Sequence, residues 1–142
     1  MCYELYLSTS SLEDLSRYNS EFVHFEHAAD LDDWLAGILL HPAKWYIGSQ
    51  SGCSCTFRYS AKEDTEFREP QEWYPEEDDN IQATTELYRA VAALVHGGYP
   101  VDCLVVWSGA EPAAIKTMSV SLKTVSEEAF RLFENWHFVF EA

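Results

Sequence analysis

The apolar run Val101-Asp102-Cys103-Leu104-Val105-Val106-Trp107 sets the architecture of this chain. It is almost continuous in strand-forming residues, and Cys103 within it behaves as a small hydrophobe. Such a run is typical of a central strand that is covered on both faces. We therefore place residues 101–107 in the interior of a β-sheet, with Cys103 in the core.

The segment before this run predicts the best helix of the chain. Apolar side chains recur at helical spacing over residues 81–95, and Asp79 or Asn80 can cap the N-terminus. His96 suits the negative end of the helix dipole, and Gly97-Gly98 can supply the left-handed residue that often ends a helix. We expect this helix to lay its apolar stripe on the sheet.

The residues that follow the central run predict a strand, a second helix and a final strand. Residues 115–124 alternate apolar and hydroxyl side chains, so one face of this strand should be solvated. Ser126 can cap a helix over residues 126–136, with two acids in its first turn. Residues 137–141 can then return as an edge or closing strand.

The N-terminal part of the chain is less regular. Residues 2–9 alternate like a strand, and residues 12–18 predict a short helix. Residues 21–27 are rich in aromatic side chains and lack a helical stripe, so they should be extended. Residues 31–40 fit either a helix with an aspartate at its start or a further strand.

Residues 44–50 and 53–59 predict a β-hairpin that turns through Ser51-Gly52. In its second strand, Cys53 and Cys55 would lie on one face, because side chains two apart on a strand point the same way. That face is apolar. The first interpretation is therefore that both thiols are small buried members of the core.

Two thiols on one face could also bind a metal or carry redox chemistry. Zinc would need two further ligands, and no second Cys-x-x-Cys or His-x-x-x-His supplies the usual spacing. A disulfide between Cys53 and Cys55 would be strained, because their Cα atoms would be about 6.5–7 Å apart on a strand. No cofactor is therefore assigned, and Cys53 and Cys55 are kept as candidate zinc ligands.

Together the elements indicate an α+β fold, with a mixed or mainly antiparallel sheet and helices packed on one face. A chain of 142 residues with 47% hydrophobic residues can fill one core, so residues 1–142 should form a single domain. No apolar run approaches the ~20 residues of a membrane span, and the N-terminus lacks a signal-peptide pattern. We expect a soluble cytoplasmic protein with reduced cysteines.

The formal charge of −15 restricts the partners that this protein can have. Direct binding to nucleic acid or to an anionic membrane is disfavoured, because only nine Lys and Arg residues are available to neutralise phosphates. A basic protein would instead be attracted across a Debye length of about 8–10 Å. The alternative is that the charge serves solubility alone.

The negative charge is concentrated in an acidic surface segment, residues 62–79, which holds nine acids. Pro70 and Pro75 bracket Trp73-Tyr74 within it, and a connection of this length is usually functional or mobile. Trp and Tyr often anchor interfaces, and acids steer basic partners. The candidate partner-binding residues are Glu72, Trp73, Tyr74, Glu76, Glu77, Asp78 and Asp79. The alternatives are a solvated acidic loop and aromatic rings that fold back over the sheet.

No catalytic residue is assigned, because the sequence lacks a Gly-x-Ser-x-Gly elbow, a phosphate-binding Gly-x-x-x-x-Gly-Lys and a His-Glu-x-x-His. These features favour a non-enzymatic protein-binding module, such as an acidic inhibitor or an immunity-type neutraliser of a basic protein. One alternative is a thiol- or metal-dependent protein centred on Gly52-Cys53-Ser54-Cys55. The other is an enzyme whose site is assembled from residues distant in sequence.

Overall fold

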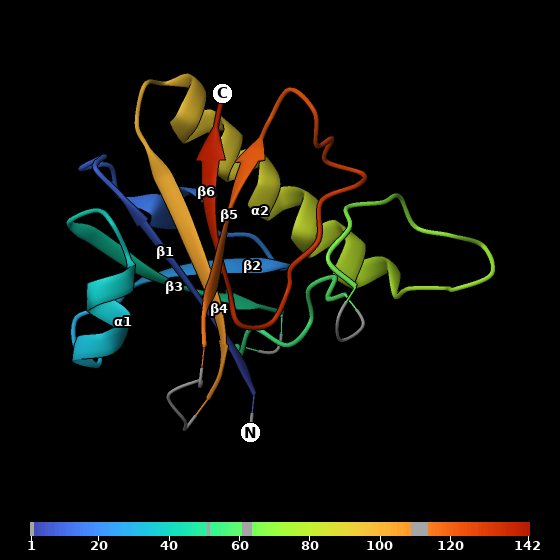
Figure 1. Ribbon diagram of the computed structural model, residues 1–142, viewed down its shortest axis with the longest axis horizontal. Coiled ribbons are helices and arrows are strands. Elements are labelled where there is room, and N and C mark those ends of the chain that lie inside the picture. The colour runs from blue at the N-terminus through green and yellow to red at the C-terminus, as the bar shows by residue number, and fades with distance from the viewer. Residues whose placement is uncertain (1, 51, 61–63, 109–113) are drawn as a thin grey trace.

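The computed structural model describes residues 2–50, 52–60, 64–108 and 114–142 (Figure 1). Its framework is a mixed sheet of six strands in the order β2-β3-β1-β4-β6-β5, which confirms the α+β class. In chain order the elements are β1 (Tyr3–Thr9), the 3-10 helix η1 (Leu15–Tyr18), β2 (Val23–His27), α1 (Asp33–Ile38), β3 (Ala43–Ser49), α2 (Asp78–His96), β4 (Val101–Trp107), β5 (Lys116–Ser121) and β6 (Trp136–Glu141).

Strand β4 lies inside the sheet, as its apolar sequence predicts. It pairs antiparallel with β1 on one side and with β6 on the other. Every residue of β4 except Trp107 is buried. The strand is therefore covered on both faces.

Different helices cover the two faces of β4. On one face Cys103 and Val105 belong to the large core cluster that includes the buried side of α2. On the other face Leu104 and Val106 pack with Leu35 of α1 in a smaller cluster. Neighbouring residues of a strand point to opposite faces. The expectation that the helices pack on one face is therefore wrong, because α1 covers the second face.

The predicted helix over residues 126–136 is absent: residues 126–135 form an irregular connection with turns, and Trp136 is the first residue of β6. Phe130 and Phe133 in this connection are buried, and Leu132 forms a parallel bridge with Tyr59. The spacing of Phe130, Phe133 and Trp136 resembles a helical stripe, yet these rings reach the core from an irregular backbone. Strand β6 is also not an edge strand, because it lies between β4 and β5 and is parallel to β5.

The predicted strand over residues 53–59 is absent from the described backbone, where residues 53–57 form turns and bends. Strand β3 ends at Ser49, whose N–H donates to the Cys53 carbonyl oxygen at 2.8 Å. Ser51, part of the predicted turn, lies outside the described residues. The two cysteines of this segment therefore do not share a strand face.

The helices differ in detail from their predicted extents. Residues 12–18 contain only the short helix η1, which Asp14 caps by accepting a hydrogen bond from Ser16 N. Residues 31–40 contain α1, so the helical alternative is correct there. The long helix α2 ends near Gly98, whose φ of 92° is the left-handed conformation predicted for the glycine pair. Among the described helices, none is long and apolar enough to cross a membrane.

Candidate functional site

The buried side chain of Arg58 bonds to both ends of residues 68–76, the central part of the acidic segment. We call this set of contacts the Arg58 clamp. Arg58 Nη2 donates to the Arg68 carbonyl oxygen and to the Glu76 carboxylate, at 2.9 Å in each case. Its Nε also donates to Glu76, at 3.0 Å. Its Nη1 donates to the carbonyl oxygens of Glu128 and Phe130, at 3.0 Å. Only 3% of the Arg58 side chain is exposed, so this ion pair is fixed inside the protein.

The residues between the two clamped positions form what we call the aromatic loop (residues 69–75). Its tip is a turn in which Tyr74 N donates to the Gln71 carbonyl oxygen at 3.1 Å. Trp73 and Tyr74 are 75% and 58% exposed, and their rings meet edge to face with centroids 6.3 Å apart. In Figure 1 the light-green chain that leads into α2 projects away from the sheet. The two rings therefore do not fold back over the sheet.

A second buried arginine, Arg131, fixes the chain just before the aromatic loop. It forms an ion pair with Asp64 at 2.9 Å, and its Nε donates to the Glu66 carbonyl oxygen at 2.6 Å. Arg68 also pairs with the carboxylates of both acids. Burial is the largest influence on the pKa of Asp64 and raises it, but hydrogen bonds from Arg131 and Glu66 N and the charges of Arg131 and Arg68 hold the pKa below 3.8. We call residues 64–68 the stem of the aromatic loop; its acids, Asp64 and Glu66, are thus paired with arginines of the same chain.

The structure separates the seven predicted partner-binding residues. Glu76 belongs to the clamp and does not display its carboxylate to a partner. The other six are exposed, either in the aromatic loop (Glu72, Trp73, Tyr74) or at and just before the start of α2 (Glu77, Asp78, Asp79). Asp78 and Asp79 also stabilise the positive end of the α2 dipole. Lys62 and Glu63, at the beginning of the predicted acidic segment, lie outside the described residues.

Sequence reasoning missed Arg58 and Arg131 as parts of this surface. Each arginine interrupts an apolar stretch, Phe57-Arg58-Tyr59 and Phe130-Arg131-Leu132. A cation among apolar neighbours indicates a buried ion pair, because a buried charge needs a partner. That signal was available, but it does not say which of the many acids is the partner.

Three cysteines come together at a second position. The sulfur atoms of Cys2, Cys53 and Cys55 lie within 4.8 Å of one another, and all three residues are half-buried. Cys103 is 1% exposed, so its predicted place in the core is confirmed. The core prediction for Cys53 and Cys55 is wrong, because no alternating strand turns them inward. None of the four cysteines, all in the described part of the chain, forms a disulfide.

The backbone around the three thiols is held by hydrogen bonds to the sheet. Cys2 N donates to Ser108 Oγ at 3.2 Å, and Ser108 N donates to the Cys2 carbonyl oxygen at 2.8 Å. Ser54, between the other two cysteines, is fully buried. Its hydroxyl accepts from Leu5 N at 3.0 Å and donates to the Ile47 carbonyl oxygen at 2.6 Å. Strands β1 and β3 therefore fix the turn that carries Cys53 and Cys55.

The surroundings of Cys55 disfavour its ionised form in the absence of a metal. Burial, followed by a hydrogen bond with Cys53, raises the pKa of the Cys55 thiol to about 11, although a hydrogen bond from Tyr3 N acts in the opposite direction. The thiolate, not the thiol, is the nucleophile in cysteine chemistry. Cys55 is therefore protonated at neutral pH and is a poor candidate for a reactive cysteine.

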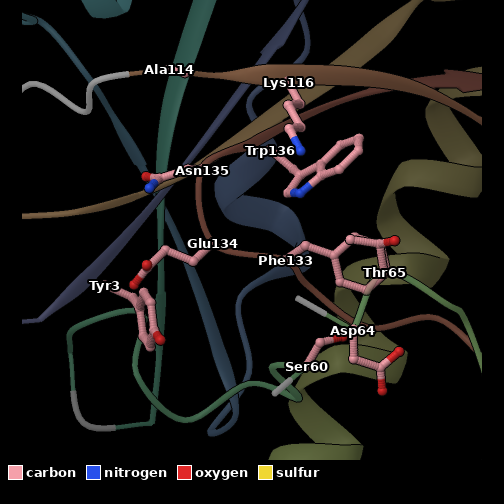
Figure 2. A pocket seen from close by; sticks show the side chains of 10 residues that line it. All are labelled: Tyr3, Ser60, Asp64, Thr65, Ala114, Lys116, Phe133, Glu134, Asn135 and Trp136. Atoms are coloured by element: carbon pink, nitrogen blue, oxygen red, sulfur yellow. The ribbon is translucent and has the colours of Figure 1, made fainter. Parts of the chain in front are cut away.

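Tyr3 also lines a cavity of about 640 Å³ (Figure 2). Figure 2 shows the Glu134 side chain beside the Tyr3 ring, and the Lys116 ammonium lies 5.7 Å from the centroid of the Trp136 ring. Burial, then the charge of Glu134 and a hydrogen bond with it, raise the pKa of Tyr3. Among the described residues that line the cavity there is no histidine or cysteine. The described part of the lining could hold a small polar ligand and contains no pair of nucleophile and imidazole base.

Ser8, Asp102 and His137 form a buried group with the residue types of a hydrolase triad. Here the aspartate, not the histidine, is the central member that bonds to the other two. His137 Nε2 lies 2.6 Å from Asp102 Oδ2, and the Ser8 hydroxyl donates to the same carboxylate. In a catalytic triad the serine bonds to the histidine, which is the base. All three residues are at most 4% exposed. Asp102 also accepts from Leu40 N at 2.9 Å, so the group ties the chain after α1 to the sheet.

Three positions therefore qualify for a function: the aromatic loop, the group of three thiols and the cavity beside Tyr3. No protein-family model, curated protein or solved structure matches the chain.

Proposed function

We propose that the protein is a non-enzymatic binding module that docks a basic protein through the aromatic loop. The observation that supports this most directly is the Arg58 clamp, which joins both ends of a loop whose tip exposes Trp73 and Tyr74. Compact loops with joined ends are frequently functional. An acidic inhibitor or an immunity-type neutraliser of a basic protein is the form that this function would take.

The arrangement of the aromatic loop suits binding for two energetic reasons. Trp and Tyr are enriched among the residues that dominate binding energy, and an exposed Trp offers a large apolar area for burial. A loop already fixed by Arg58 and by the turn at Tyr74 loses less conformational entropy when a partner binds. Both rings are therefore presented in an ordered form before binding.

The charge of the chain suits a basic partner. Glu72 is exposed, and within the described residues no ion pair engages it. The net charge of −15 would accelerate association with a basic surface. Charge would thus set the rate of encounter, and the aromatic rings would set the lifetime of the complex.

The test compares the protein with two variants as immobilised bait in cell extract, at low and high salt. The first variant carries Trp73→Ala and Tyr74→Ala, and the control carries Leu12→Ala, which removes another exposed apolar side chain, 96% accessible. We expect a basic protein to bind the wild type and the control at low salt and to be lost from the double variant. Equal retention by all three baits would contradict the proposal.

A second comparison isolates the electrostatic part. Glu72→Gln with Glu77→Gln should slow association with the captured protein and weaken its salt dependence. Glu21→Gln with Glu26→Gln changes the net charge equally at exposed acids elsewhere and is the matched control. Association rates that fall equally in both pairs would show that overall charge, rather than this surface, attracts the partner.

A second candidate function is small-molecule binding, and with it catalysis, in the cavity beside Tyr3. Ser60 is one of the residues that line this cavity, and its hydroxyl is buried without a hydrogen-bond partner among the described residues. Rotation of this side chain toward the cavity would let a polar ligand satisfy the hydroxyl. A thermal-shift screen of small polar metabolites tests this. A ligand that stabilises the wild type but not Lys116→Ala supports the candidate, and a shift that persists in the variant places the ligand elsewhere.

A further inference from the structure

The group of three thiols supports an inference that does not depend on the aromatic loop. We propose that Cys2, Cys53 and Cys55 bind one thiophilic d10 cation, Zn²⁺ or Cu⁺, through three thiolates. The sequence pointed only to the second and third of these residues. The fold adds Cys2, which precedes β1, because β1 pairs with β3 and the turn after β3 carries the other two.

The distances between the sulfur atoms fit this role. A d10 ion with metal–sulfur bonds of about 2.3 Å places its sulfur ligands about 3.8–4.0 Å apart. The three sulfur atoms lie within 4.8 Å of one another. Closing the remaining distance takes a shift of less than about 1 Å per sulfur, which side-chain rotation supplies without moving the anchored backbone.

The surroundings of the thiols are already arranged as a metal site requires. Ser108 fixes the backbone of Cys2, and the buried Ser54 fixes the turn between the other two cysteines. Tyr3 N donates a hydrogen bond to the Cys55 sulfur, as outer-shell groups of thiolate sites do. All three cysteines are half-buried, so an ion has access from solvent.

The donor set determines the class of ion. Soft thiolate ligands select Cu⁺ and Zn²⁺ over the hard ions Ca²⁺ and Mg²⁺, which take oxygen ligands. No described His, Asp or Glu joins the three sulfur atoms in a larger group. Cu⁺ would therefore be held by three sulfurs, whereas Zn²⁺ would keep a fourth position for water. In either case each thiol releases its proton to solvent as its metal–sulfur bond forms.

The test titrates reduced, metal-free protein with Zn²⁺ and separately with Cu⁺ under anaerobic conditions, each against a chromophoric chelator. Three variants remove one ligand each: Cys2→Ser, Cys53→Ser and Cys55→Ser. Cys103→Ala is the matched control, because it removes a thiol from the core. We expect one equivalent of metal per chain in the wild type and in the control. Each ligand variant should bind at least about 100-fold more weakly, since even outer-shell changes typically cost 10–100-fold.

A second readout is the spectrum of the protein loaded with Co²⁺ in place of Zn²⁺. Thiolate ligation gives an intense sulfur-to-cobalt charge-transfer band, which should weaken in each ligand variant and persist in the control. Melting curves of the metal-free variants show whether each one is folded. Trp73→Ala with Tyr74→Ala should bind metal normally, so failure of the aromatic loop as a docking site leaves this inference intact.

Three results would overturn the inference. The first is the absence of stoichiometric binding of either ion by folded, reduced protein. The second is an equal loss of affinity in the Cys103→Ala control. The third is a disulfide between two of the three cysteines that resists reductant in the folded protein and so excludes metal.

Discussion

Arg58 uses all of its guanidinium nitrogens, and each one finds an oxygen acceptor. A buried charge is tolerated only when its hydrogen-bonding capacity is filled, because desolvation of an ion costs several kcal/mol. The carbonyl oxygens of Glu128 and Phe130 belong to the connection between β5 and β6, whereas Glu76 lies just before α2. Arg58 thereby joins its own segment to the acidic segment and to the β5–β6 connection, which are all distant in sequence.

We expect Arg58→Met to destabilise the protein by about 3 kcal/mol, because it leaves the Glu76 carboxylate and the buried Phe130 carbonyl oxygen without their donor. The control is Arg89→Met. Arg89 forms an equally short ion pair with Glu127 but is 62% exposed, so its loss should cost less than about 1 kcal/mol. Urea unfolding measures both changes. Equal costs would show that the Arg58 clamp contributes no more than a surface ion pair.

The four cysteines should differ in their accessibility to a thiol reagent. Burial raises the pKa of Cys103 well above its usual value, and the residue is enclosed by the core. In native, metal-free protein we expect Cys103 to be labelled only as fast as the molecule unfolds. Mass spectrometry after timed labelling resolves the four positions. Labelling of Cys103 as fast as that of Cys2 would contradict its place in the core.

At the scale of elements, the stem of the aromatic loop should respond to acid. The pKa of Asp64 in the folded protein is below its usual 3.8, so its pairing stabilises the stem above that value and is lost as the pH falls through the folded pKa. We expect the protection of the amides in residues 64–68, measured relative to their intrinsic exchange rates, to fall in this range before the sheet opens. Asp64→Asn should remove the pH dependence of this protection. Protection that falls equally in the wild type and the variant would assign the effect to other acids.

The end of β3 depends on Gly48, which lies against the turn that follows it. A Cβ at Gly48 would approach the Gly52 carbonyl oxygen to 2.8 Å, so Gly48→Ala must displace this turn. We expect a cost of about 1–3 kcal/mol. Gly37→Ala is the control, because nothing lies within 4 Å of a Cβ there and alanine favours helix α1 by roughly 0.5–1 kcal/mol. Calorimetry should therefore give opposite signs for the two variants.

The elements predicted correctly from the sequence are those whose periodicity is long and unmixed, such as β4 and α2. The predicted helix over residues 126–136 is wrong because Phe130, Phe133 and Trp136 recur every three residues, as they would on one helix face, although the backbone there is irregular. The predicted strand over residues 53–59 failed because Ser54 bonds to β1 and β3 with its side chain in place of a backbone ladder. Local patterns cannot distinguish these cases, since the deciding contacts are distant in sequence.

For the candidate sites, the sequence likewise predicts the residue types but not the distant contacts that bring them together. Exposed aromatic and acidic residues of the aromatic loop follow from composition and from Pro70 and Pro75. The clamp that orders them does not, because it depends on how Arg58 reaches Glu76 and Phe130 in space. Cys2 likewise joins the other two thiols only after β1 and β3 pair.

At the scale of the whole molecule, the charge of −15 should oppose folding through self-repulsion. Salt screens this repulsion, while the buried Arg58 pair is screened much less. We therefore expect the melting temperature to rise with added NaCl at constant pH near neutrality. KCl should act equally if screening is the cause. A melting temperature that falls with either salt would mean that the surface ion pairs outweigh the repulsion.

The pairing of β1 with β4 has a consequence for how the chain is made. Tyr3 pairs with Trp107 and Thr9 with Val101, so most of the polypeptide lies between the two strands at the centre of the sheet. Folds dominated by such distant contacts assemble slowly. During synthesis β1 leaves the ribosome well before β4, so one edge of β1 stays unpaired until β4 has followed. An unpaired strand edge exposed for that time favours aggregation unless a chaperone binds it.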